Sequence, residues 1–128
     1  MISYGFSKQV KLSFEEAEQK VTAQLQKEGF GVLTRIDVRD KLKEKLGVDF
    51  KKYVILGACS PANAYKAIQV EENIGLLLPC NVIVYEKDGK TVLSIIKPLT
   101  VMGTIGNDAL CKVAGYVEVL LKRVFDAM

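Results

Sequence analysis

The chain of 128 residues contains no histidine, and it has only three cysteines and three prolines. Without an imidazole it cannot form a Ser-His-Asp or Cys-His nucleophile pair, a histidine-ligated zinc site or a histidine switch near neutral pH. No apolar run approaches the roughly twenty residues that a membrane-spanning helix requires, and residues 1–6 lack the pattern of a secretory signal. The chemistry that remains is that of thiols, carboxylates, lysines or tyrosines.

The composition is that of an ordinary globular protein, with 49% hydrophobic and 26% charged residues. The length fits a single domain over residues 1–128, because a chain of this size buries a sizeable core without disulfides or metals. The net charge of +3 comes from interspersed signs, so neither a nucleic-acid nor a membrane partner is implied. An odd number of cysteines favours reduced thiols and a cytoplasmic location.

Hydrophobic periodicity predicts both strands and helices along the chain. A capping box at Ser13-Phe14-Glu15-Glu16 begins the first helix, and Asp88-Gly89 is a strong hairpin signal. Ser60 and Pro61 begin another helix, in which the serine side chain is expected to bond a free N–H. We predict Leu99–Gly106, which contains Gly103 and Gly106, to be a connection. The predicted strands cover residues 2–12, 32–38, 53–59, 82–85 and 91–96, and the predicted helices cover 14–28, 40–46, 61–70 and the segment that follows the cap Asn107.

These elements predict an α+β fold with two layers. The strands come in neighbouring groups and the last two form a hairpin, so we expect a mainly antiparallel sheet with helices packed on one face. No repeat or linker interrupts the chain.

Two segments form the only candidate functional motif that we find in the sequence: Gly57-Ala58-Cys59-Ser60-Pro61 and Leu78-Pro79-Cys80-Asn81. Each places a cysteine where a strand meets a turn. Cys59 directly precedes a helix N-terminus, whose N–H groups and dipole favour a thiolate. If the two strands are neighbours, Cys59 and Cys80 could form a reversible disulfide or supply two ligands to a soft metal.

For each cysteine a structural role is more common than a chemical one, because free cysteine usually behaves as a small buried hydrophobe. A zinc ion would need further ligands from Cys111, carboxylates or a second subunit, so we predict no metal and no cofactor. The lysines at 41, 43, 45, 51 and 52 are interrupted by acidic residues and read as a solvated face. The sequence contains no phosphate-binding loop and no dinucleotide-binding fingerprint, and we identify no catalytic residue.

The chain resembles the domain-of-unknown-function family 302. The resemblance rests on Gly29-Phe30-Gly31-Val32-Leu33-Thr34 with Ile36-Asp37-Val38, on residues 53–61 and on residues 75–82. It implies a fold similar to the TATA-box-binding-protein-like class, with the order β-α-β(4)-α and small additional helices. It also implies a homodimer, and it leaves the activity open.

Three hypotheses on function follow. The first is a small cytoplasmic ligand-binding or regulatory domain without catalysis, with a small-molecule site formed by Cys59, Ser60, Pro61, Pro79, Cys80 and Asn81. The second is a thiol-based redox or sulfur-handling protein that uses Cys59 and Cys80. The third is a structural or interaction module that acts through homodimerisation.

Overall fold

The computed structural model describes residues 2–128. Twelve elements follow one another along the chain, and the capping and turn signals in the sequence account for several of their ends. In order they are β1 (Gly5–Val10), α1 (Phe14–Lys27), β2 (Gly31–Asp37), α2 (Val38–Leu46), β3 (Tyr53–Cys59), α3 (Pro61–Val70), the 3-10 helix η1 (Glu72–Leu77), β4 (Cys80–Lys87), β5 (Lys90–Ile96), α4 (Pro98–Met102), the 3-10 helix η2 (Gly103–Ile105) and α5 (Asp108–Asp126).

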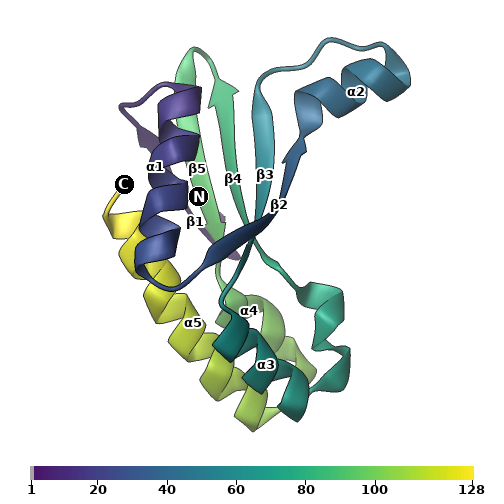
Figure 1. Ribbon diagram of the computed structural model, residues 1–128, viewed down its shortest axis with the longest axis vertical. Coiled ribbons are helices and arrows are strands. Elements are labelled where there is room, and N and C mark those ends of the chain that lie inside the picture. The colour runs from purple at the N-terminus through teal and green to yellow at the C-terminus, as the bar shows by residue number, and fades with distance from the viewer. Residues whose placement is uncertain (1) are drawn as a thin grey trace.

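The five strands form one sheet in the order β1-β5-β4-β3-β2, and every neighbouring pair is antiparallel. Helices α1 and α5 lie along one face of the sheet, whereas α3 and α4 lie beyond one end of it (Figure 1). Helix α2 projects from the opposite end and has no buried residue. The predicted α+β class, with an antiparallel sheet and helices on one face, is confirmed.

Two hydrophobic clusters hold these layers together. The larger cluster lies between the sheet and helices α1 and α5, and it includes Leu25, Val82 and Leu121. The smaller cluster joins α3, η1, α4 and α5 beyond the end of the sheet, around Ile74 and Leu110. Helix α5 contributes buried side chains to both clusters, so it connects the sheet to the helical end of the molecule.

Local signals in the sequence are confirmed at several element boundaries. The Ser13 hydroxyl accepts from the Glu16 N–H and the Glu16 carboxylate accepts from the Ser13 N–H, which completes the predicted capping box. Asn107 caps α5 by accepting from the Leu110 N–H. Asp88 and Gly89 have φ of 52° and 75°, as a two-residue hairpin turn with two positive φ angles requires.

Other expectations were wrong. The segment Leu99–Gly106 is largely helical, because Pro98 begins α4 and η2 continues it. The first strand is shorter than predicted and covers Gly5–Val10. Helix α2 begins at Val38 instead of Asp40, since the Asp37 side chain caps it by accepting from the Asp40 N–H.

The alternation predicted for 32–38 also fails, because β2 is an edge strand whose side chains are mostly exposed. A bulge further interrupts its register with β3 between Val32 and Thr34.

Candidate functional site

Strand β4 separates two spaces on opposite faces of the sheet. Successive side chains of a strand point to opposite faces, so Cys80, Val82 and Val84 lie in the core, whereas Asn81 and Ile83 line a hollow on the face that α1 and α5 leave free. Of the six residues predicted to form one site, four line the inner space, Asn81 lines the hollow, and Pro61 lines neither.

The thiol cavity, as we name the inner space, lies where β3 and β4 meet α3, α4 and α5. Cys59, Ser60, Pro79 and Cys80 line it together with Phe30, Asn63 and Met102, among others. It is mainly apolar, and its volume is about 30 Å³. That volume suits about one water molecule.

The two predicted cysteines thus border one cavity, but burial makes Cys80 a poor source of thiolate. Burial, with a smaller contribution from Cys59, raises the pKa of the Cys80 thiol to about 11. Cys80 is consequently a protonated thiol at neutral pH, whereas nucleophiles and metal ligands require the thiolate. Within residues 2–128, no group of three or more His, Cys, Asp or Glu side chains could hold a metal ion.

Ser60 and Pro61 begin α3, yet the serine does not act as predicted. Its side chain makes no capping bond to a backbone N–H; its oxygen instead accepts from Nδ2 of Asn63 at 2.8 Å. This bond provides a partner for the buried Asn63 amide at the wall of the thiol cavity. Pro61 is exposed and does not line the cavity.

Pro79 also packs against the middle of β3. A β-carbon on Gly57 would lie 2.7 Å from Cγ of Pro79 and would also overlap the Thr34 side chain. Gly57 therefore lets the chain before β4 approach β3 closely, which brings Pro79 and Cys80 beside Cys59.

The open-face hollow, as we name the second space, lies over β1, β5, β4 and β3 on the side without helices. Its volume is about 450 Å³. Ile83 and Ile96 give it apolar surface, and Asn81 and the buried Ser94 add polar groups. The Ser94 and Ser7 hydroxyl oxygens lie 2.7 Å apart and share a hydrogen bond.

Three tyrosines and two lysines also line this hollow: Tyr4, Tyr53, Tyr85, Lys51 and Lys87. The rings of Tyr53 and Tyr85 stack, with centroids 5.3 Å apart and an angle of 13° between their planes. The Lys51 ammonium lies 4.9 Å from the centre of the Tyr85 ring. Burial raises the pKa of Tyr53, and the neighbouring Tyr85 and Tyr4 add to the increase.

The sequence pattern places none of these tyrosines and lysines in a site, and it indicates a solvated face for Lys51. Tyr53 and Tyr85 lie far apart in the chain, and they meet because they are directly paired across β3 and β4. One signal was available: Tyr85 and Ile83 alternate with the core residues of their strand, so an aromatic residue on the second face could have been noted. Asn81 was predicted as a site residue, but as a neighbour of the cysteines.

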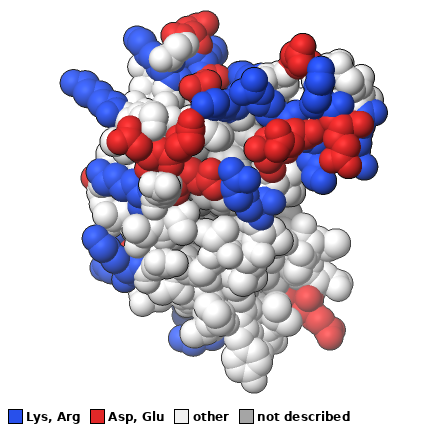
Figure 2. Space-filling model, turned by 45° about the horizontal axis from the view of Figure 1, so that its top comes forward, with Lys and Arg blue, Asp and Glu red and all other residues white. Residues whose placement is uncertain are grey.

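None of the helices in the described part of the chain is long and apolar enough to span a membrane. The charged side chains concentrate over the part of the molecule that carries α1 and α2, whereas the end formed by the other helices is largely free of charge in this view (Figure 2).

Comparisons with known proteins agree with this architecture. No curated protein matches the chain. The crystal structure of an uncharacterized conserved DUF302 protein from Bacillus stearothermophilus is similar, with 32% sequence identity, a TM-score of 0.91 and coverage of 98% of each chain. Residues 6–128 match the family described as "Domain of unknown function DUF302". The chain therefore belongs to the DUF302 family.

Proposed function

We propose that the protein is a non-catalytic domain that binds a small molecule in the open-face hollow. The observation that carries this proposal is the lining of the hollow, in which aromatic and apolar side chains border a volume of about 450 Å³, within the range of roughly 300–1,000 Å³ that is typical of ligand sites. Apolar side chains and a few convergent polar groups line it, as in most small-molecule sites. Of the residues predicted from sequence, Asn81 belongs to this site.

The thiol cavity is a poorer ligand site. Its volume of about 30 Å³ is an order of magnitude below that typical range. Cys59, Ser60, Pro79 and Cys80 then serve the binding function indirectly, by joining the end of the sheet to α3 and α5.

Ligand-observed screening of a small-molecule collection, followed by amide chemical-shift mapping, tests the proposal. We expect binders to shift amides of β1, β4 and β5 around Ile83 and Ser94. Tyr85→Ala should weaken their binding at least about tenfold, because it removes a ring that lines the hollow. Tyr116→Ala is the matched control, since Tyr116 lies exposed on α5. Shifts that cluster around the thiol cavity, or equal affinity in both variants, would contradict the proposal.

A thiol-based function is the second candidate, because Cys59 and Cys80 border the same cavity. The free state of all three cysteines supports the reducing, cytoplasmic setting that we infer for this chain. The raised pKa of Cys80 leaves Cys59 to begin any reaction. Alkylation of native protein below about pH 8, near the ordinary thiol pKa, tests this candidate: rapid modification of Cys59 supports it, and inert thiols exclude it.

We further propose that the protein forms a homodimer through its helical end. This surface is defined by exposed hydrophobic side chains of α3, η1 and η2, and a contiguous exposed apolar surface commonly marks an interface. A second copy is the simplest partner, because most oligomers are symmetric homo-oligomers. The side chains are Tyr65, Ile68, Val70, Leu76, Leu77 and Ile105.

Sedimentation of a charged variant tests the dimer. Leu76 is 88% exposed, so Leu76→Glu should leave the fold intact while it places a charge in the interface and shifts the species to a monomer. Leu46→Glu is the control, because Leu46 is 68% exposed on α2, far from the helical end. A monomeric wild type, or a Leu76→Glu variant that dimerises as the wild type does, would refute this interface.

A further inference from the structure

We propose that the open-face hollow selects small organic anions that have a flat apolar body. This inference rests on the proposed function and specifies the class of ligand. It is carried by the distribution of charge around the hollow, by the stacked tyrosines and by the contrast between two adjacent lysines.

The charge of the hollow has one sign. Lys51 and Lys87 line it, and no carboxylate appears among its described lining residues. Neither lysine takes part in a salt bridge within residues 2–128. Two ammonium groups without partners beside an apolar surface are complementary to a ligand that carries both an anionic group and an apolar body.

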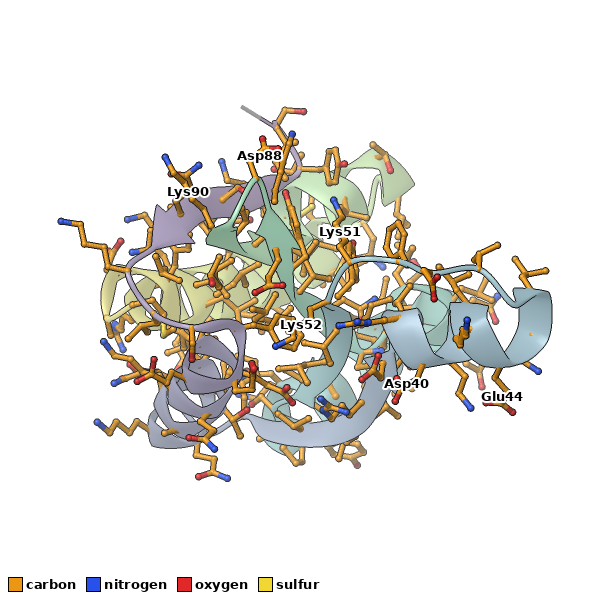
Figure 3. All side chains as sticks on the ribbon, turned by 90° about the horizontal axis from the view of Figure 1, so that it is seen from above. Asp40, Glu44, Lys51, Lys52, Asp88 and Lys90 are labelled. Carbon is orange, nitrogen blue, oxygen red and sulfur yellow. The ribbon has the colours of Figure 1, made fainter. Side chains whose placement is uncertain are left out.

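The adjacent Lys52 provides the contrast. Its ammonium group lies 2.7 Å from a carboxylate oxygen of Glu15 in α1, on the face that the helices cover. Lys51 and Lys52 extend to opposite sides of the start of β3 (Figure 3). The same charge is therefore neutralised by an ion pair on one face of the sheet and left available on the other.

Aromatic contacts hold the available charge in place. The Lys51 ammonium lies near the rings of both Tyr85 and Phe50, at 4.9 and 5.8 Å from their centres. A cation over an aromatic face is attracted by the ring, so Lys51 is positioned beside the stacked Tyr53 and Tyr85. A flat ligand could contact these rings while its anionic group meets the ammonium.

The tyrosine hydroxyls complete the recognition of an anion. The Tyr53 phenol, which like any tyrosine is protonated at neutral pH and whose pKa burial raises further, can donate a hydrogen bond. One of the paired hydroxyls of Ser7 and Ser94 donates to the other, so the pair keeps one free O–H donor in the same hollow. Ammonium and hydroxyl groups all donate to oxygen atoms of a carboxylate, sulfonate or phosphate.

Two fluorescent probes with the same rings test the inference. Anilinonaphthalenesulfonate carries one anionic group, and N-phenylnaphthylamine lacks it. We expect the wild type to bind the sulfonate about tenfold more tightly than the neutral probe, as one charge-assisted hydrogen bond allows. Amide shifts must map the sulfonate to β4 and β5 around Ile83 and Ser94.

Variants then identify the groups that read the charge. Lys51→Gln combined with Lys87→Gln should abolish the preference for the sulfonate, because the loss of affinity for the sulfonate should exceed any change in affinity for the neutral probe by about tenfold. Lys52→Gln removes an equal charge next to Lys51 on the other face, so it should retain the preference. Loss of preference in Lys52→Gln to the same extent would overturn the inference, because overall charge would then explain it.

The outcomes separate this inference from the proposed function. Equal binding of both probes in the hollow refutes anion selection while small-molecule binding stands. Failure of both probes and of the wider screen to reach the hollow refutes the proposed function as well. A single-stranded oligonucleotide that displaces the sulfonate from the hollow at lower concentration than unlabelled small anions would also overturn the inference, since the occupant would then be a nucleic acid.

Discussion

At Gly57, β3 lies in close contact with side chains of β2 and of the chain before β4. A β-carbon there would lie 2.7 Å from Pro79 Cγ and would overlap Thr34. We expect Gly57→Ala to lower the free energy of unfolding by about 1–3 kcal/mol, the usual effect of overpacking. Gly31→Ala is the control, because Gly31 lies in the neighbouring strand and a β-carbon there meets nothing within 4 Å. Urea denaturation measures both; equal stabilities would contradict the close approach.

The buried thiol of Cys80 makes stability depend on pH in the alkaline range. Its pKa of about 11 in the folded protein exceeds the ordinary value of 9.0, so the unfolded chain loses this proton first and its ionisation favours unfolding. The contribution to stability is complete below about pH 9 and is lost as the pH rises toward about 11, by about 2–3 kcal/mol in total.

The comparison of wild type with Cys80→Ala isolates this effect, because the other groups that titrate at alkaline pH are the same in both proteins. From about pH 9 to pH 11, we expect the unfolding free energy of the wild type to fall relative to that of Cys80→Ala. Parallel pH profiles would show that Cys80 titrates normally.

Individual residues could be placed from the sequence only where local rules apply. The rule that a strand end meets a helix start brought Cys59 and Cys80 to attention, and both line one cavity. The same segment misled for Asn81, because a shift of one position along a strand reverses the face. The contact between Lys51 and Tyr85 depends on strand pairing far along the chain, which no local pattern encodes.

At the scale of elements, Asn107 joins two helices. Its side chain accepts from the Leu110 N–H at the start of α5 and donates to the Val70 carbonyl at the end of α3, at 3.0 and 2.8 Å. We expect Asn107→Ala to reduce stability by about 1–3 kcal/mol, since it removes both the cap and the bridge.

Asn107→Ser separates the two contributions, because serine retains an oxygen that caps the helix but lacks the amide donor. It should recover about half of the lost unfolding free energy, as thermal and urea unfolding would measure. A serine variant no more stable than the alanine variant would argue that the cap contributes nothing and that the bridge to α3 carries the whole effect.

Elements with strong end signals were predictable, and those set by tertiary contacts were not. The ranges of β3 and α3 agree with the prediction, because an uninterrupted apolar strand is followed directly by a helix-starting proline. The segment Leu99–Gly106 contains two glycines and reads as a loop. Its helical conformation is stabilised by packing, since Met102 is buried in the smaller cluster against α5.

At the scale of the whole molecule, α5 makes the two hydrophobic clusters one unit. Leu110 and Ala114 belong to the smaller cluster, Leu120 and Leu121 to the larger, and Val113 packs against both. We therefore expect the chain to unfold as the single domain proposed for it. Ile74→Ala should cost about 2–5 kcal/mol and lower the midpoint of one transition seen equally by circular dichroism and tyrosine fluorescence.

Leu46→Ala is the control, because Leu46 is exposed on α2 and lies outside both the smaller cluster and the proposed dimer interface. It should leave the midpoint nearly unchanged. A separate early transition in Ile74→Ala, confined to part of the helical signal, would instead show that the helical end unfolds on its own.

The bulge in β2 has a consequence for the behaviour of the protein in concentrated solution. An edge strand offers unpaired backbone groups to any other extended chain, and regular edges therefore promote aggregation. Between Val32 and Thr34 the register of β2 shifts, and a bulge of this kind bends and twists its strand. An incoming strand could match only a short part of this edge, so the irregularity that interrupts the sequence pattern also makes β2 a poor template for pairing with other chains.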